Sequence, residues 1–172
     1  MSEKAIIVGG TFGFMHKGHR ALLGKAFRIG DSVYIGLTTD AYVKRKRHGG
    51  LIPKYAARKR ALERFARSFG KPFGIKPLED RFGPSTTGDF YAMVVSKETK
   101  PTALEINRIR KGSGLRPLRI AQVRRVLAED GMPISTLRII RREIDGEGRR
   151  VTAPDKHRRR AKERRPRNRQ KE

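Results

Sequence analysis

The sequence is informative first in what it lacks: it has no cysteine, no tryptophan, and only eight phenylalanines and four tyrosines among 172 residues. Without cysteine, the chain has no disulfide bond, no zinc–thiolate site and no thiol nucleophile. No apolar run approaches the roughly 18 residues that a membrane-spanning helix needs, and the N-terminus lacks a signal-peptide pattern. We therefore expect a cytoplasmic protein without membrane contact.

Acidic residues are also scarce: 17 Asp and Glu stand against 42 Lys and Arg, which leaves a formal net charge of +25. So strong a positive charge favours anionic partners, namely nucleotides, phosphorylated small molecules or nucleic acid, and says nothing about the fold. The few aromatic residues are not interleaved with basic ones, as they are in modules that stack on bases. A role in nucleic-acid binding therefore has charge alone in its favour.

Composition divides the chain near its C-terminal end. Residues 151–172 contain ten Lys and Arg, three Asp and Glu, two prolines and no apolar periodicity. Dense like charge opposes compaction, so this segment is typical of a disordered tail. We predict one domain over residues 1–150, long enough to bury a core, and a basic tail over residues 151–172 that either stays solvated or contacts RNA or another polyanion.

Two common phosphate motifs are absent: the chain has neither G-x-G-x-x-G nor G-x-x-x-x-G-K-[ST]. The sequence therefore lacks the main motif that would assign it to the dinucleotide-fold dehydrogenases or to the P-loop NTPases. Short β-branched runs instead alternate with amphipathic stretches of about ten to fifteen residues, which indicates an α/β protein. The predicted fold is a doubly wound, Rossmann-like parallel sheet of about five strands with helices on both faces.

The elements of this fold follow from periodicity and turn residues. The expected strands are residues 5–8, 32–37, 73–78, 91–96 and 118–123, and the expected helices are residues 20–29, 54–69, 101–111 and a last one with Ser135 as N-cap. Pro77 favours an edge position or an early end for the third strand, because proline cannot donate to an interior ladder. Residues 44–50 are expected to form a mobile basic loop, and the basic residues of the helix at 54–69 are interpreted as a solvated face.

The stretch AIIVGGTFGFMHKGH, residues 5–19, places two histidines just after a buried strand and a glycine turn. In parallel α/β sheets, ligands bind beyond the carboxyl ends of the strands, and a helix that begins there offers free N–H groups to an anion. Glycines let the backbone approach phosphate oxygens, and imidazoles add donors. The stretch predicts a phosphate site; the alternative is a pair of surface histidines that cap a helix.

GGTF followed by HKGH resembles the HxGH signature of the nucleotidyltransferase superfamily. Further segments occur in the same order as in phosphopantetheine adenylyltransferases of the archaeal and eukaryotic type: TTD at 38–40, FGP at 82–84 after Asp80, VSKET at 95–99, IN at 106–107 with Arg110, AEDG at 128–131 and PIST at 133–136. The match covers residues 4 to about 149. It implies transfer of AMP from ATP to 4′-phosphopantetheine, giving dephospho-coenzyme A and pyrophosphate, with Mg²⁺ accompanying ATP.

The resemblance also implies a role for each matched residue. His19 would bind the triphosphate and stabilise the transition state, and His16 would assist it. Lys44, or else Lys46, would hold the acceptor phosphate together with Thr11, although a solvated loop lysine is the alternative for either. In-line attack of one phosphate on another needs positioning and charge neutralisation rather than a covalent intermediate, which suits these side chains.

The ATP site implied by the resemblance is built from three stretches of the chain. Its expected residues are Gly10, Thr11, Phe12, His16, Gly18 and His19 at the first strand; Ser96, Lys97, Glu98, Thr99 and Asn107 at the fourth strand; and Ile134, Ser135, Thr136 and Arg138 near the end. Ordinary capping and surface polarity are the alternative for Thr99 and Asn107. The sequence indicates no metal-ligand set of its own.

Three positions depart from the family pattern: Gly13 stands where an aspartate usually follows Thr-Phe, Leu137 replaces a threonine, and Arg142 replaces a glycine. Nicotinamide-mononucleotide adenylyltransferases and glycerol-phosphate cytidylyltransferases share HxGH and its mechanism, so they remain alternatives that differ in the acceptor. Class I aminoacyl-tRNA synthetases would need a KMSKS-type loop and a longer chain. A nucleic-acid-binding protein of the same fold without catalysis is the alternative from a different functional class. The oligomeric state stays open.

Overall fold

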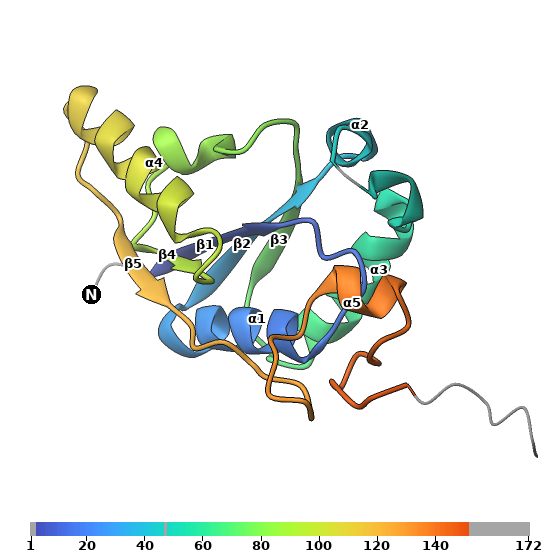
Figure 1. The fold of residues 1–172 in the computed structure, drawn as a ribbon. Helices are drawn as coiled ribbons and strands as arrows, with labels where there is room; N and C mark the ends of the chain where they lie inside the picture. The colour runs from blue at the N-terminus through green and yellow to red at the C-terminus, as the bar shows by residue number, and fades with distance from the viewer. Residues whose placement is uncertain (1–2, 47, 152–172) are drawn as a thin grey trace, which may run out of the picture.

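A five-stranded parallel sheet forms the middle layer of the protein, in the order β3-β2-β1-β4-β5 (Figure 1). The computed structural model describes residues 3–46 and 48–151. The strands are β1 (Ala5–Gly10), β2 (Ser32–Thr38), β3 (Phe73–Leu78), β4 (Ala92–Val95) and β5 (Arg119–Gln122). All four pairings are parallel, which confirms the doubly wound sheet predicted from the sequence. β3 lies at the edge, where Pro77 interrupts no interior ladder.

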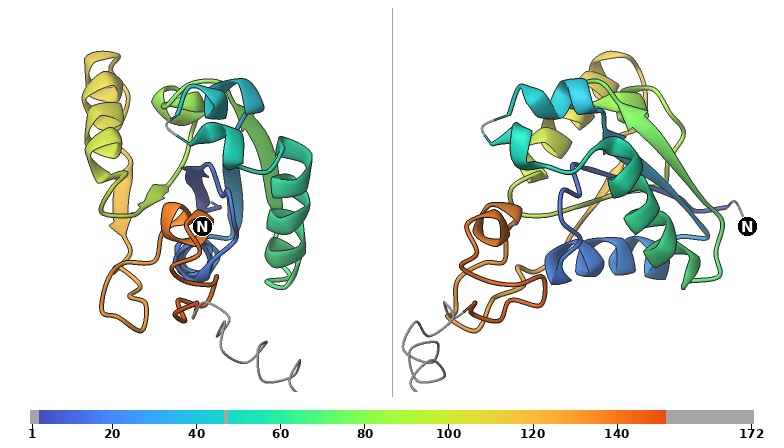
Figure 2. Two further views of the ribbon diagram at one scale, coloured as in Figure 1. Left: turned by 45° about the vertical axis from the view of Figure 1, so that its right-hand side comes forward. Right: turned by 90° about the vertical axis from the view of Figure 1, so that its right-hand side faces the viewer.

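Helices cover both faces of this sheet (Figure 2). They are α1 (Lys17–Ile29), α2 (Asp40–Lys44), α3 (Tyr55–Arg67), α4 (Lys100–Gly112) and α5 (Thr136–Ile140), with short 3₁₀ turns η1 (Gly49–Leu51) and η2 (Gly83–Thr86). α1 begins three residues earlier than the sequence indicates. α2 and η1 lie on either side of the stretch expected to be a loop and include its ends, Lys44 at one and Gly49 and Gly50 at the other. These two short elements were not predicted from periodicity.

The strand residues alternate between two apolar cores because successive side chains point to opposite faces. Ile6 and Val8 of β1 pack with α1 and α3, where Phe27 stacks on Phe69 at 4.3 Å between ring centroids. Ile7, between them, packs on the other face with α4. Buried apolar area is the main source of stability in such a layered fold. It holds the carboxyl ends of β1, β2 and β4 side by side.

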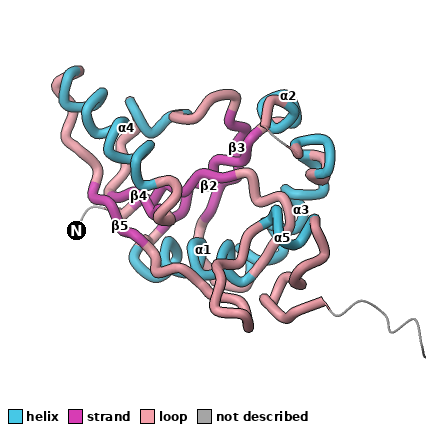
Figure 3. The backbone as a smooth tube through the Cα atoms, viewed as in Figure 1, coloured by secondary structure: helices cyan, strands magenta, loops and turns pink. Residues whose placement is uncertain are grey.

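The segment after β5, residues 123–151, is mostly loop (Figure 3) and returns to the start of α1. Its own small apolar cluster contains Ala128, Ile134 and Ile144. The carbonyl oxygen of Gly146 accepts a hydrogen bond from the backbone N–H of Lys17 at 2.9 Å, and Glu147 forms an ion pair with Arg20. This late segment therefore closes over the helix that carries the histidine motif.

Residues 152–172, nearly all of the predicted basic tail, lie outside the described residues. The division into a domain over residues 1–150 and a tail therefore stays a prediction. Within the described residues, none of the helices has the length and apolar character required to cross a bilayer.

Candidate active site

A cleft opens where the carboxyl ends of β1, β2 and β4 meet α4 and η2, with a volume of about 870 Å³ that includes its open mouth. We call it the strand-end cleft, and its lining includes Gly10, Lys46, Leu78, Phe82, Met93 and Ile106. The doubly wound topology places ligands at this end of the sheet. The histidines do not line the cleft itself; they lie beyond the loop that follows Gly10.

That loop folds back on itself around Phe12, whose side chain is 2% exposed and whose φ is 47°. A left-handed backbone is unusual for an aromatic residue and is found mainly where the surrounding structure imposes it, often at functional sites. A Cβ on Gly10 would lie 3.0 Å from the Phe12 ring, so the glycine makes room for it. The Phe12 ring in turn packs on His19, with 5.1 Å between ring centroids.

His16 caps the start of α1: its Nδ1 accepts a hydrogen bond from the backbone N–H of His19 at 3.3 Å. Gly18 permits this geometry, because a Cβ there would lie 3.0 Å from Cε1 of the His16 ring. Since Nδ1 accepts, neutral His16 carries its proton on Nε2 and can donate from that atom. Burial, together with the charge of Arg20, lowers the pKa of His16 to about 4.

His19 has the opposite tautomer. Its Nδ1 lies 3.0 Å from the carbonyl oxygen of Phe14, which can only accept, so Nδ1 donates and neutral His19 is left with a lone pair on Nε2. Burial and the neighbouring His16 lower the pKa of His19 to about 3, against the opposing effect of the Phe14 hydrogen bond. The two rings stack with centroids 3.7 Å apart. His19 can donate from Nε2 to a phosphate only after it takes up a proton.

On the cleft side of the loop, the hydroxyl of Thr11 accepts two hydrogen bonds. Its Oγ1 accepts from Nζ of Lys46 at 2.8 Å and from Oγ1 of Thr38 at 3.2 Å. Partial burial and the charge of Arg58 lower the pKa of Lys46. Lys44, the first choice from the sequence, lies at the end of α2 and is exposed, as Lys46 also is, but the Lys44 side chain makes no hydrogen bond or ion pair with the described residues. The structure thus brings Lys46, rather than Lys44, to the loop.

Arg58 of α3 lies beneath this group, and the sequence did not reveal it. Its side chain is 1% exposed, so the interpretation of the basic residues on this helix as solvated is wrong for Arg58. The guanidinium donates to the carbonyl oxygens of Thr11 at 3.0 Å and Thr38 at 2.8 Å. One signal was available: Arg58 shares the apolar face of its helix with Leu62, four residues on.

The chain resembles known proteins over most of its length. The Cytidylyltransferase-like family model matches residues 7–142, from β1 to beyond α5. The phosphopantetheine adenylyltransferase of Methanothermobacter thermautotrophicus is 44% identical over 144 residues, which cover 83% of this chain and 87% of that protein. This chain belongs to the phosphopantetheine adenylyltransferase family. The family predicted from the sequence segments is therefore confirmed.

Other members of the phosphopantetheine adenylyltransferase family differ in length. A bifunctional phosphopantetheine adenylyltransferase/NTP phosphatase of Thermoplasma volcanium is 49% identical over 146 residues, but this chain spans only 44% of it. Among solved structures, a protein of unknown function from Archaeoglobus fulgidus superposes with a TM-score of 0.64 at 29% identity, covering 70% of this chain and 89% of that one. Pantothenate synthetase of Thermus thermophilus, at 18% identity over 80% of this chain and 61% of that one, has a TM-score of 0.55 and shares the fold alone.

The residues expected to bind adenosine lie at the end of β4, as the family resemblance indicates, but several are already engaged. Ser96 and Thr99 bond to each other, the N–H of Ser96 donating to Oγ1 of Thr99 at 3.0 Å, and Glu98 pairs with Arg125. The side-chain amide of Asn107 binds both backbone groups of Leu118, at 2.8 and 2.9 Å. Asn107 therefore anchors β5 to α4, and its contact with ATP stays a prediction. Lys97 is exposed.

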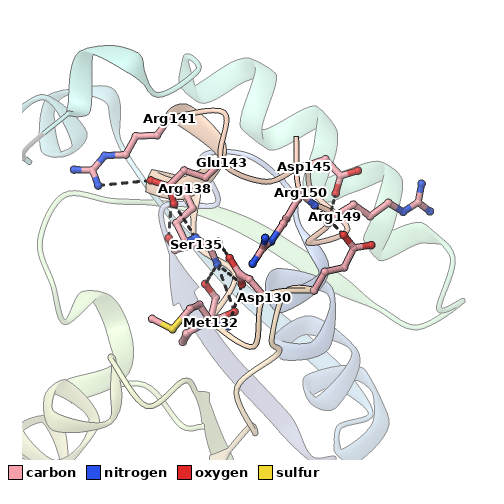
Figure 4. A network of polar contacts seen from close by, with 11 residues as sticks. Asp130, Met132, Ser135, Arg138, Arg141, Glu143, Asp145, Arg149 and Arg150 are labelled. Carbon is pink, nitrogen blue, oxygen red and sulfur yellow. Dashed lines mark hydrogen bonds and ion pairs between the residues drawn. The ribbon is translucent and has the colours of Figure 1, made fainter. Parts of the chain in front are cut away.

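α5 begins beside the histidine loop. Ser135 caps it, with Oγ accepting from the N–H of Arg138 at 3.3 Å, which confirms the predicted N-cap. The Arg138 guanidinium is held by the carboxylates of Asp130 and Glu143 (Figure 4). The hydrogen bond from Arg138 also lowers the pKa of Asp130. In this structure Arg138 organises the turn around α5; its expected contact with the triphosphate stays a prediction.

The structure explains one departure from the family pattern, Gly13, and shows a cost for another, Arg142. A Cβ on Gly13 would lie 2.9 Å from Cδ1 of Ile52 and 3.1 Å from Cγ2 of Thr136, so the glycine lets the stretch after η1 and the start of α5 close over the loop. Arg142, where the family has glycine, has a φ of 57°. Glycine adopts that left-handed conformation without strain, whereas a residue with a Cβ does not. Nothing in the structure explains Leu137.

Proposed function

We propose that this chain transfers AMP from ATP to 4′-phosphopantetheine, releasing pyrophosphate and dephospho-coenzyme A. The observation that carries the proposal is the loop between Gly10 and His16, which presents the Thr11–Lys46 pair on one side and the stacked histidines on the other. One side suits an acceptor phosphate and the other suits a triphosphate, so groups bound along the two sides of this loop could meet and react at its edge.

In this proposal, the acceptor phosphate binds Nζ of Lys46 and Oγ1 of Thr11, and ATP lies along the start of α1. Nε2–H of neutral His16 donates to the triphosphate, and the hydroxyls at the start of α5 contact it from the other side. An oxygen of the acceptor phosphate attacks the α-phosphorus in line, and the bond from that phosphorus to the oxygen bridging to the β-phosphate breaks. Protonated His19 neutralises charge on the α-phosphoryl oxygens as the transition state forms.

The strand-end cleft would hold the remainder of the acceptor. Its lining is apolar at Leu78, Phe82 and Met93, and Lys46, which also lines it, bonds to Thr11 of the histidine loop. A phosphopantetheine arm is narrow, flexible and largely apolar between its amides. We favour phosphopantetheine over nicotinamide mononucleotide or glycerol phosphate because relatives at 44% identity are named phosphopantetheine adenylyltransferase.

We propose that Mg²⁺ enters with ATP. No group of three or more His, Cys, Asp or Glu side chains lies together within residues 3–46 and 48–151. Mg²⁺ commonly binds through substrate phosphates and water with one or two carboxylates, so the triphosphate would supply most of its ligands here. The ion would neutralise phosphate charge. Holding and orienting the two phosphate groups would remain the task of the loop residues.

The deciding experiment incubates the full chain with ATP, Mg²⁺ and one acceptor at a time, and measures pyrophosphate. 4′-Phosphopantetheine should give rapid release, and nicotinamide mononucleotide and glycerol 3-phosphate should not. Strong turnover of either alternative without turnover of phosphopantetheine would contradict the acceptor. Absence of turnover with every acceptor would favour the non-catalytic alternative.

We propose further that the basic tail contacts RNA or another polyanion, and that the protein is cytoplasmic. The support for the first is charge alone: residues 151–172 carry ten of the 42 Lys and Arg. Exposed Arg60, Arg64 and Arg67 of α3 add a row of cations to the described surface. Each phosphate contact of this kind releases counterions, so such binding would weaken steeply with salt.

A further inference from the structure

Arg58 is a buried cation whose hydrogen bonds converge just beneath the loop that presents Thr11. Besides the carbonyl oxygens of Thr11 and Thr38, its guanidinium reaches the carbonyl oxygen of Pro53 at 2.7 Å and Oδ1 of Asp40 at 2.9 Å. These groups belong to three stretches of the chain: the loop after β1, the junction of β2 with α2, and the approach to α3. A single side chain therefore joins three segments next to the proposed acceptor phosphate.

Stability alone is a poor reason for this arrangement. Burying a charge is unfavourable unless it is paired and hydrogen-bonded, and a buried ion pair often stabilises a fold no better than apolar side chains of similar size. Among the described residues one carboxylate pairs with the guanidinium, and that Asp40 side chain is itself 38% exposed, so solvent weakens the pair. The other contacts are to carbonyl oxygens without a formal charge.

The contacts of Thr11 and Thr38 connect the Arg58 guanidinium to the proposed phosphate position. Arg58 holds both residues by their carbonyl oxygens, while their hydroxyls bond to each other and to Lys46 on the cleft side. The backbone geometry set by Arg58 thus decides where Oγ1 of Thr11 and Nζ of Lys46 meet. The same guanidinium is near enough to lower the pKa of Lys46, so its field also reaches the proposed phosphate position.

We propose that Arg58 is a positioning residue for the acceptor phosphate. It fixes the ends of β1 and β2 so that Thr11 and Lys46 grip the phosphate together, and its charge adds to the attraction. This inference rests on the proposed function. Its consequence is selective: loss of Arg58 weakens the acceptor side of the reaction far more than the binding of ATP, because ATP is assigned to the start of α1.

The test compares Arg58→Lys and Arg58→Met with a matched control, Lys71→Met. Lys71 is also a cation bound to carbonyl oxygens, those of Phe27 at 2.8 Å and Gly30 at 2.7 Å, but it lies at the amino end of the strands, away from the site. For each variant, kcat, KM for 4′-phosphopantetheine, KM for ATP and the melting temperature are measured. Displacing a positioned group by about 1 Å can lower a rate by about a hundredfold.

Arg58→Met should lower kcat/KM for the acceptor by about 10- to 100-fold and leave KM for ATP within about twofold. Arg58→Lys keeps the charge but cannot reach all four acceptors, so it should fold and still lose at least about fivefold on the acceptor side. Lys71→Met should melt at a lower temperature with both KM values unchanged. If Arg58→Lys retains the acceptor KM and kcat of the original protein, or if the two KM values rise together, the proposal is wrong.

Direct binding distinguishes this proposal from the proposed function. Inorganic phosphate and 4′-phosphopantetheine are titrated calorimetrically into the unmodified protein and into Arg58→Lys, without ATP. Binding that weakens at least fivefold in the variant supports positioning even if no acceptor is turned over. Equal binding to both proteins overturns it, whatever the activity assay shows.

Discussion

Binding of ATP should draw a proton from solution onto His19. The Phe14 carbonyl accepts from Nδ1, so only the doubly protonated ring can also donate from Nε2 to a phosphate. With a pKa of about 3 in the free protein, about one His19 in ten thousand is charged at pH 7. Raising the pKa to 7 requires about 5 kcal/mol of preferential interaction with the charged form.

A bound triphosphate can supply this energy. Two opposite unit charges 4 Å apart interact by about 4 kcal/mol at the effective dielectric constant of a partly buried site, and the triphosphate brings more than one negative charge. We therefore expect uptake of about half a proton or more per ATP bound at pH 7. His16 should contribute none, because its neutral form already donates from Nε2.

Calorimetric titration of a non-hydrolysable Mg·ATP analogue in buffers of different ionisation enthalpy measures this uptake. His19→Gln should abolish it and lower kcat by about 10²- to 10³-fold, the usual loss for one preorganised donor, with little change in acceptor KM. His16→Asn is the matched control, since asparagine preserves the helix cap. Proton uptake near zero in the unmodified protein, or undiminished uptake in His19→Gln, would refute the reasoning.

The same pKa shifts predict how the free protein responds to acid. The folded state keeps both histidines neutral down to about pH 4 and about pH 3, whereas the unfolded chain binds these protons near pH 6.5. The unfolded state thus holds more protons between these values, so stability is complete above pH 6.5 and falls as the pH drops through this window. Denaturant titrations from pH 7 to pH 4 should show a smaller fall in His16→Asn than in the unmodified protein.

Three further outcomes are expected. In steady-state kinetics, Lys46→Met should raise acceptor KM by about tenfold or more, while Lys44→Met should change it by less than about twofold. A larger effect of Lys44→Met would mean that Lys44 binds the acceptor phosphate. Arg142→Gly should raise the free energy of unfolding by about 1 kcal/mol through relief of the left-handed backbone, and chemical denaturation showing no gain would contradict the strain. Removal of residues 151–172 should leave adenylyl transfer intact. It should also reduce the slope of log K for RNA binding against log salt by about 0.7–0.9 per lost phosphate contact, and an unchanged slope would exclude RNA binding by the tail.

Local sequence patterns predicted much of this protein's fold. Strand runs such as residues 5–8 and most of α1 can be predicted from the sequence, because an apolar spacing of two or 3.6 residues is a property of neighbouring residues, although periodicity placed the start of α1 three residues too late. The position of β3 at the edge followed from Pro77 in the same way. The HxGH motif and the later segments predicted the family because their residue types and their order along the chain resemble those of its members.

Only the tertiary structure decided which residues meet at the loop. Arg58 is 47 residues from Thr11 and Lys46 is 35 residues from it, and no periodicity reports contacts over such separations. The choice of Lys46 over Lys44 depends on the turn that follows α2, and the opposite tautomers of His16 and His19 depend on which backbone group each ring reaches. Sequence sets which groups are available for chemistry, whereas burial and hydrogen bonding across distant segments set their positions and protonation.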